Sequence, residues 1–136
     1  MVNSSGVVNG SVRTVLRLEA LALLIASVLL YAHLGASWTL FAILFLTPDL
    51  SMLAYFAGPR IGAAAYNLAH ATIAPIAAAL LGYLSNWTML EAIGLIWLAH
   101  VGIDRALGFG LKYASAFGDT HLGRIGRATR RLEQPA

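Results

Sequence analysis

The sequence predicts an all-α integral membrane protein, a bundle of four transmembrane helices with both termini in the cytoplasm. Hydrophobic residues make up 59% of its 136 residues and charged residues only 11%, and the mean hydropathy is +0.74. An average soluble domain has about 25% charged residues and leaves much of its surface in water. No charged residue occurs between Glu19 and Asp49 or between Arg60 and Glu91. Each gap is long enough for a helix to cross the bilayer core.

The first half of the chain divides at short polar or glycine-containing segments. Residues 1–14 are mostly small and polar and are expected to be a disordered amino-terminal segment. The transmembrane domain, residues 15–110, then begins with a span at about 15–34. Glu19 falls near the amino end of this span, where the helix dipole tolerates an anion. A turn at 33–37 leads into the second span, at about 38–57.

The second half repeats this pattern of span and turn. The Gly-Pro-Arg turn at 58–60 precedes a third span at about 61–83, and a fourth span is expected at about 89–108. Pro48 and Pro75 each remove a backbone hydrogen bond, so a kink is expected in the second and third spans. The remaining residues, 111–136, form a basic tail that is expected to be cytoplasmic.

The distribution of basic residues predicts the orientation. All nine Lys and Arg residues lie near the amino terminus, at the 58–60 turn, or from Arg105 onward. By the positive-inside rule this places both termini of a multi-pass cell-membrane protein in the cytoplasm. The positive net charge is therefore topological, and no nucleic acid partner is expected. The arginines between 124 and 131 are expected to contact anionic lipid headgroups in the surrounding bilayer.

Polar residues occur at one depth in three of the spans. At ~1.5 Å per residue, Asp49, His70 and His100 each lie ~12–13 Å from the cytoplasmic end of their span. Asp104 follows His100 by four residues and therefore shares its helix face. Ionisable groups at such a depth are costly and usually face protein groups or a water-filled cavity. A polar centre in the cytoplasmic half of the bundle is therefore predicted.

The residue types at this centre suit a divalent metal. Two imidazoles and two carboxylates, from His70, His100, Asp49 and Asp104, match the ligand preferences of zinc, manganese or iron. The chain has no cysteine, so thiolate ligands are excluded. An open coordination position would let the metal activate water. Other residues are candidates for supporting roles at this centre. Candidates for orienting a metal ligand or binding substrate are Glu19, Tyr66, Asn67 and Arg105. Asp119 and His121 are candidates for capping the site.

Other interpretations of the same residues remain open. The four groups would also suit a satisfied polar network, in which Arg105 pairs with a carboxylate, or a relay for protons or ions. The corresponding functions are a metal-dependent and hydrolytic membrane protein, a structural or partner-binding subunit, and a small transporter that acts as a homo-oligomer. Whether the chain is an enzyme is left open by these residues.

Small residues in the third span predict its packing face. Ala63, Asn67, His70, Ala74 and Ala77 form one stripe at helical spacing. Small side chains allow helices to approach closely in membranes. This stripe is expected to face the bundle.

Three segments resemble a known family: TPDLSMLAYFAGPRIGAAAYNLAH, WLAHVGIDRALGFGLKY and FGDTHLGRIG. They are similar to a bacterial family defined by a domain of unknown function, DUF4260, over about residues 17–126. The resemblance implies a small integral membrane protein of four helices and brings no established activity. The order of Pro48-Asp49, His70 and His100-to-Asp104 is also similar to short motifs of predicted membrane-bound metal-dependent hydrolases. Those proteins have a second aspartate where Ser51 stands and paired histidines near His70.

Overall fold

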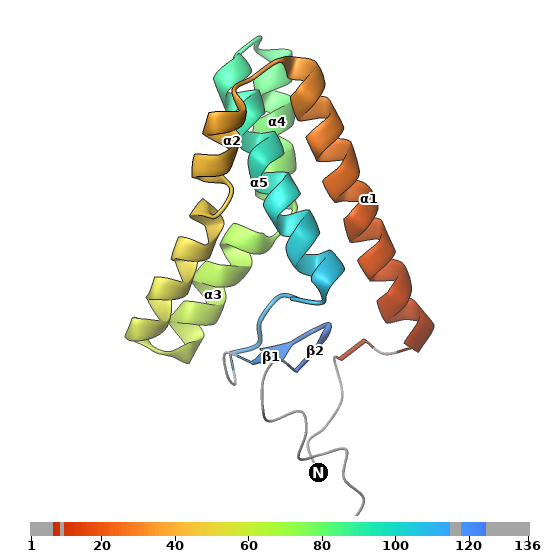
Figure 1. The fold of residues 1–136 in the computed structure, drawn as a ribbon. Helices are drawn as coiled ribbons and strands as arrows, with labels where there is room; N and C mark the ends of the chain where they lie inside the picture. The colour runs from red at the N-terminus through yellow and green to blue at the C-terminus, as the bar shows by residue number, and fades with distance from the viewer. Residues whose placement is uncertain (1–6, 9, 115–117, 125–136) are drawn as a thin grey trace, which may run out of the picture.

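The computed structural model describes residues 7–8, 10–114 and 118–124, which form an all-α bundle whose helices correspond to the four predicted spans (Figure 1). The first span is α1 (Gly10–Leu34), and the second consists of α2 (Trp38–Leu44) and the 3-10 helix η1 (Thr47–Ala57). The third consists of α3 (Pro59–His70) and α4 (Ile73–Leu84), and the fourth is α5 (Thr88–Leu107). A β-hairpin of β1 (Asp119–Thr120) and β2 (Gly123–Arg124) follows. Residues 1–6 and 9 of the amino-terminal segment predicted to be disordered, and the arginines at 127, 130 and 131, lie outside the described residues, whereas residues 10–14 of that segment are helical.

The surface of the bundle is that of a membrane protein. Three segments are long and apolar enough to cross a bilayer: Gly10–Leu34, Trp38–Ala57 and Pro59–Leu84. Large apolar side chains on these segments point outward; Phe56, for example, is 92% exposed and Ile73 79% exposed. Soluble proteins rarely expose contiguous apolar surface on this scale. Hydrocarbon is the environment in which such a surface is stable.

Helix α5 is the centre of the bundle. Its buried residues, from Ala92 to Gly102, lie on all sides of the helix, as expected for a helix surrounded by others. Helices α1 and α4 pack along it. A Cβ added at Gly94 would lie 2.4 Å from the Ala79 backbone nitrogen, and one at Gly82 would lie 2.3 Å from the Glu91 backbone nitrogen. Because these two positions lack a Cβ atom, the backbones of α4 and α5 can approach each other this closely.

The two prolines break their spans, where the sequence predicts kinks. A proline ring clashes with the carbonyl four residues earlier and cannot donate a hydrogen bond to it. Helix α2 accordingly ends at Leu44, four residues before Pro48, and η1 begins at Thr47. In the third span, α3 ends at His70, and Ala71, four residues before Pro75, adopts an extended conformation.

Side chains satisfy the carbonyl groups that these breaks release. The Thr47 hydroxyl donates a hydrogen bond of 2.7 Å to the Leu44 carbonyl oxygen. From α5, Trp97 Nε1 donates to the Ala69 carbonyl oxygen at 2.5 Å, and Arg105 Nη2 donates to that of His70 at 3.1 Å. Irregular backbone at membrane depth is tolerated only where protein groups pair it in this way. The hydrogen bonds from Trp97 and Arg105 therefore attach the break in the third span to α5.

Two details of the sequence prediction need correction. Helix α1 begins at Gly10, five residues before the predicted start of the first span. The small-residue stripe is correct in α3, where Ala63 and His70 are buried, but wrong at Ala77, which is exposed. The break at 71–72 interrupts the helical phase, so residues on either side of it no longer share one face.

The amino end of α1, the turn between η1 and α3, and the carboxyl end of α5 lie at one end of the molecule, below in Figure 1. There η1 and α3 pack mainly against each other and diverge from α5. We call residues 47–70 the η1–α3 hairpin.

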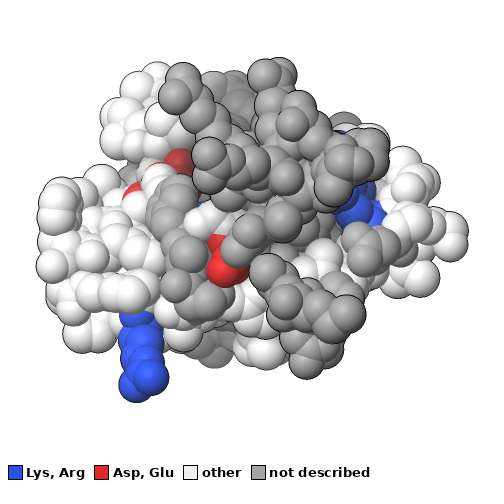
Figure 2. All heavy atoms as spheres, turned by 90° about the horizontal axis from the view of Figure 1, so that it is seen from below, with Lys and Arg blue, Asp and Glu red and all other residues white. Residues whose placement is uncertain are grey.

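The tail is joined to this hairpin by two hydrogen bonds. Asn67 Nδ2 donates to the Lys112 carbonyl oxygen at 2.7 Å, and Asn67 Oδ1 accepts from the Lys112 N–H at 2.6 Å. Figure 2, which views this end, shows basic side chains at its margins and carboxylates nearer its middle.

Candidate metal centre

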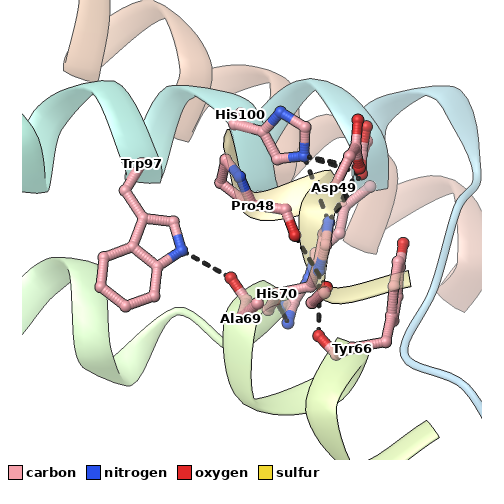
Figure 3. A network of polar contacts seen from close by, with 10 residues as sticks. Pro48, Asp49, Tyr66, Ala69, His70, Trp97 and His100 are labelled. Atoms are coloured by element: carbon pink, nitrogen blue, oxygen red, sulfur yellow. Dashed lines mark hydrogen bonds and ion pairs between the residues drawn. The ribbon is translucent and has the colours of Figure 1, made fainter. Parts of the chain in front are cut away.

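Four side chains from three spans converge where the η1–α3 hairpin meets α5 (Figure 3). Asp49 comes from the first turn of η1, and His70 is the last residue of α3. His100 and Asp104 lie one turn apart on α5. One ligand atom from each residue lies within 4.8 Å of the other three. We call these residues the four-residue cluster.

The separations within the cluster are nearly uniform. The two Nε2 atoms of His70 and His100 lie 3.2 Å apart. Asp49 Oδ1 lies 3.3 Å from the His70 Nε2 and 3.2 Å from the His100 Nε2. Asp104 Oδ2 lies 3.4 Å from each of these nitrogens. Ligands placed ~2.1 Å from a tetrahedral zinc ion are ~3.4 Å from one another. Five of the six edges of the cluster match this geometry.

The tautomer of His70 directs a lone pair into the cluster. Its Nδ1 lies 2.9 Å from the Tyr66 carbonyl oxygen, which can only accept, so Nδ1 carries the proton. In the neutral ring Nε2 is then an acceptor, and it faces another imidazole nitrogen and two carboxylate oxygens. A backbone carbonyl that fixes the second nitrogen in this way is typical of metal-binding histidines. His70 Nε2 and the two carboxylate oxygens are three acceptors that face one another, so a cation or a proton must lie between them.

The rings of both histidines are held by aromatic contacts. The Tyr66 ring stacks on His70 with centroids 3.8 Å apart and planes inclined by 10°. Phe45, just after α2, meets the His100 ring edge to face at 5.4 Å. His100 Nδ1 is buried and has no hydrogen-bond partner among the described residues. Packing against Phe45 and the contacts of its Nε2 atom within the cluster therefore orient this second imidazole.

The cluster is open on its carboxylate side. The side chains of His70 and His100 are 4% and 2% exposed, whereas those of Asp49 and Asp104 are 33% and 19% exposed. The carboxylates therefore form the accessible side of the cluster, and the imidazoles form its closed wall. This asymmetry resembles catalytic metal sites, which keep a position accessible, more than closed structural sites.

The other candidate residues have different surroundings. Tyr66 and Arg105 both contact His70, through the bonds given above. Asn67 is paired with the Lys112 backbone and joins the tail to α3. Glu19 and His121 line a separate cavity of about 300 Å³, together with Arg105 and residues of α1, α4 and the tail.

The two candidate cap residues take part in the fold of the tail. The Asp119 carbonyl oxygen accepts a hydrogen bond from the Tyr113 N–H at 2.8 Å. His121 Nδ1 accepts one from the Leu111 N–H, also at 2.8 Å. Burial lowers the pKa of the His121 imidazole, and the positive charge of Arg105 lowers it further. His121 is therefore neutral at physiological pH and acts as an acceptor for the backbone of the preceding part of the tail.

Two residues near the cluster were not among the sequence candidates. Lys112 is 5% exposed, and its ammonium group lies 4.7 Å from the centroid of the Tyr66 ring. Burial lowers the pKa of this ammonium group, and the nearby Asp104 carboxylate opposes the shift. A single lysine in the tail belongs to no repeating pattern of the sequence, so the sequence alone could not identify Lys112 as a neighbour of the cluster. Trp97 was detectable in principle, because it lies three residues before His100 and shares its helix face.

The comparisons with known proteins assign the family. The family described as Domain of unknown function (DUF4260) matches residues 13–125. The chain belongs to the DUF4260 family. All four cluster residues lie inside the matched range, so the centre is part of the DUF4260 domain. No curated protein and no solved structure matches this DUF4260 chain.

Proposed function

We propose that this DUF4260 protein binds one divalent metal ion at Asp49, His70, His100 and Asp104 and uses it for hydrolysis within the membrane. The observation that carries the proposal is the near-tetrahedral spacing of four ligand atoms, 3.2–3.4 Å apart in five of their six pairs. The two carboxylates bring two negative charges into the bundle, and a divalent ion would cancel them. Charge cancellation is important here because unpaired charge at membrane depth is costly.

The exposed side of the cluster suits a hydrolytic reaction. A metal ion with an accessible position lowers the pKa of a bound water molecule and polarises a substrate carbonyl or phosphoryl oxygen. Asp49 is the most exposed of the four side chains, so its second carboxylate oxygen would be available to accept a proton from such a water. The buried imidazoles would hold the ion, and the Tyr66 carbonyl and Phe45 ring keep the imidazoles oriented.

Metal analysis of the purified protein tests the proposal. We expect one zinc, manganese or iron ion per chain, and at least a tenfold loss of occupancy in His100→Ala and in Asp49→Asn. Occupancy should also fall in mild acid, because histidine must be neutral to coordinate a metal. His33→Ala, at an exposed position near the end of α1, is the matched control and should keep its metal. A folded parent protein that contains no metal after incubation with each divalent ion contradicts the proposal.

We also propose that the protein is a multi-pass membrane protein with both termini in the cytoplasm. The described basic residues lie at the end of the bundle that carries the amino end of α1 and the turn between η1 and α3, where they can contact anionic headgroups. The opposite turns contain no Lys or Arg. Because the chain has no cysteine, single cysteines are clean probes. A cysteine at Ser85 should react with a membrane-impermeant maleimide added to whole cells, and one at Ala57 should not. The reverse pattern would contradict the orientation.

A further inference from the structure

An apolar groove lies directly beside the four-residue cluster. It has a volume of about 310 Å³ and is lined by residues from the second, third and fourth spans: Leu44, Thr47, Pro48, Ala69, Ile93, Ile96 and Trp97. This volume is at the lower end of the ~300–1,000 Å³ typical of small-molecule pockets. Thr47 is exposed and Ile93 is 37% exposed, so the groove opens on the outer surface of the bundle. That surface faces hydrocarbon in a bilayer.

The groove offers little to a polar ligand. Its two polar side chains, Thr47 and Trp97, both donate to backbone carbonyl oxygens at the helix breaks. The rest of the lining is aliphatic or proline. An occupant must therefore be apolar where it lies in the groove.

The groove and the cluster lie next to each other along α5, where Figure 3 labels Trp97 of the groove and His100 of the cluster. Ile93, Trp97, His100 and Asp104 follow one another at helical spacing and share a face. On the opposite wall, Pro48 precedes Asp49 and Ala69 precedes His70. From Trp97, the cluster begins about 5 Å and ends about 10 Å further along the helix axis. A molecule in the groove thus has its end next to the metal ligands.

We propose that the groove binds an acyl chain of a membrane lipid and holds the ester end of that chain at the four-residue cluster. This inference rests on the proposed function and gives its substrate class, a lipid ester that enters sideways from the bilayer. The groove excludes water from the chain, and the open carboxylate side of the cluster receives the polar head.

Quenching of Trp97 fluorescence by brominated lipid tests the proposal. Trp38→Phe and Trp87→Phe leave Trp97 as the single tryptophan of the three in the chain. This protein is placed in vesicles of phosphatidylcholine whose acyl chains carry bromine either near the ester or near the methyl end. Trp97 is midway along α5, so an ordinary surrounding lipid brings its methyl end to Trp97. A chain in the groove instead brings carbons near its ester, and we expect stronger quenching by bromine near the ester.

Filling the groove provides the control. Ala69→Leu and Ile93→Phe enlarge side chains on opposite walls and should each abolish the preference for bromine near the ester. Ala64→Leu makes the same change as Ala69→Leu at an exposed position of α3 outside the groove, and should preserve the preference. Stronger quenching by bromine at the methyl end, or a preference that survives both filled variants, overturns the proposal and indicates surrounding lipid only. The measurement requires no metal, so it can fail or succeed independently of the metal analysis.

Discussion

Removal of the proposed metal ion is expected to loosen the η1–α3 hairpin from α5. Two of the proposed ligands, Asp49 and His70, belong to the hairpin, and the other two belong to α5. Apart from them, η1 and α3 pack mainly against each other. A metal ion present at 100 times its dissociation constant stabilises the protein by ~2.7 kcal/mol if it does not bind the unfolded chain. Here that free energy would stabilise the contact between the η1–α3 hairpin and α5, which otherwise share few contacts.

Distance measurements between spin labels would show this loosening. Cysteines at Ala57, at the end of η1, and Leu107, at the end of α5, are both at exposed positions. In the metal-loaded protein we expect a narrow distance distribution between labels at these sites, and after chelation a broad one. The hydrogen bond from Arg105 to His70 and the pairing of Asn67 with Lys112 remain, so the hairpin should not detach fully.

The control pair for this experiment is Leu18 and Leu107, which are both exposed and lie on α1 and α5. These helices pack along each other independently of the metal ligands, so chelation should leave their distance distribution unchanged. Broadening at this second pair would indicate general unfolding. An unchanged distribution between Ala57 and Leu107 in protein that has lost its metal would show that the metal does not join the hairpin to α5.

Much of this fold follows from simple properties of the sequence. The four spans are predicted by long stretches without charge, and their ends by glycine, proline and polar turns. The effect of the prolines was underestimated, because a kink and a complete break have the same sequence signal. Which one forms depends on whether neighbouring groups can satisfy the released carbonyls. Here Trp97 and Arg105 of α5 do so for the third span, and no local pattern links them to Ala69 and His70.

The candidate site illustrates the same limit. Depth along each span is a one-dimensional quantity, and it was enough to place Asp49, His70 and His100 at one level. The sequence could not show that their ligand atoms lie within 4.8 Å of one another, because this depends on how each helix is rotated. Lys112 was missed for a related reason. Its position beside Tyr66 depends on the path of the tail, to which the pairing of Asn67 with the Lys112 backbone and the bridge between Lys112 and Thr120 contribute.

The close packing of α4 against α5 predicts that Gly94→Ala will strongly destabilise the bundle. The added Cβ would lie 2.4 Å from the Ala79 nitrogen and 2.8 Å from its Cα, and backbone atoms cannot rotate away. Overpacking of this kind costs ~1–3 kcal/mol, more than the ~1 kcal/mol that alanine gains over glycine in a helix. The midpoint of thermal unfolding in detergent should therefore fall.

Gly102→Ala is the matched control on the same helix, where α1 approaches α5. Its added Cβ would lie 3.0 Å from the Leu24 nitrogen, so a shift of a few tenths of an ångström is enough to accommodate it. The gain in helix propensity then offsets most of the cost, and we expect a much smaller change in the unfolding midpoint than for Gly94→Ala. Equal effects of the two substitutions would mean that α4 and α5 are not packed as closely as the structure shows. A stabilised Gly94→Ala protein would be the strongest contradiction, because helix propensity alone would then decide the outcome.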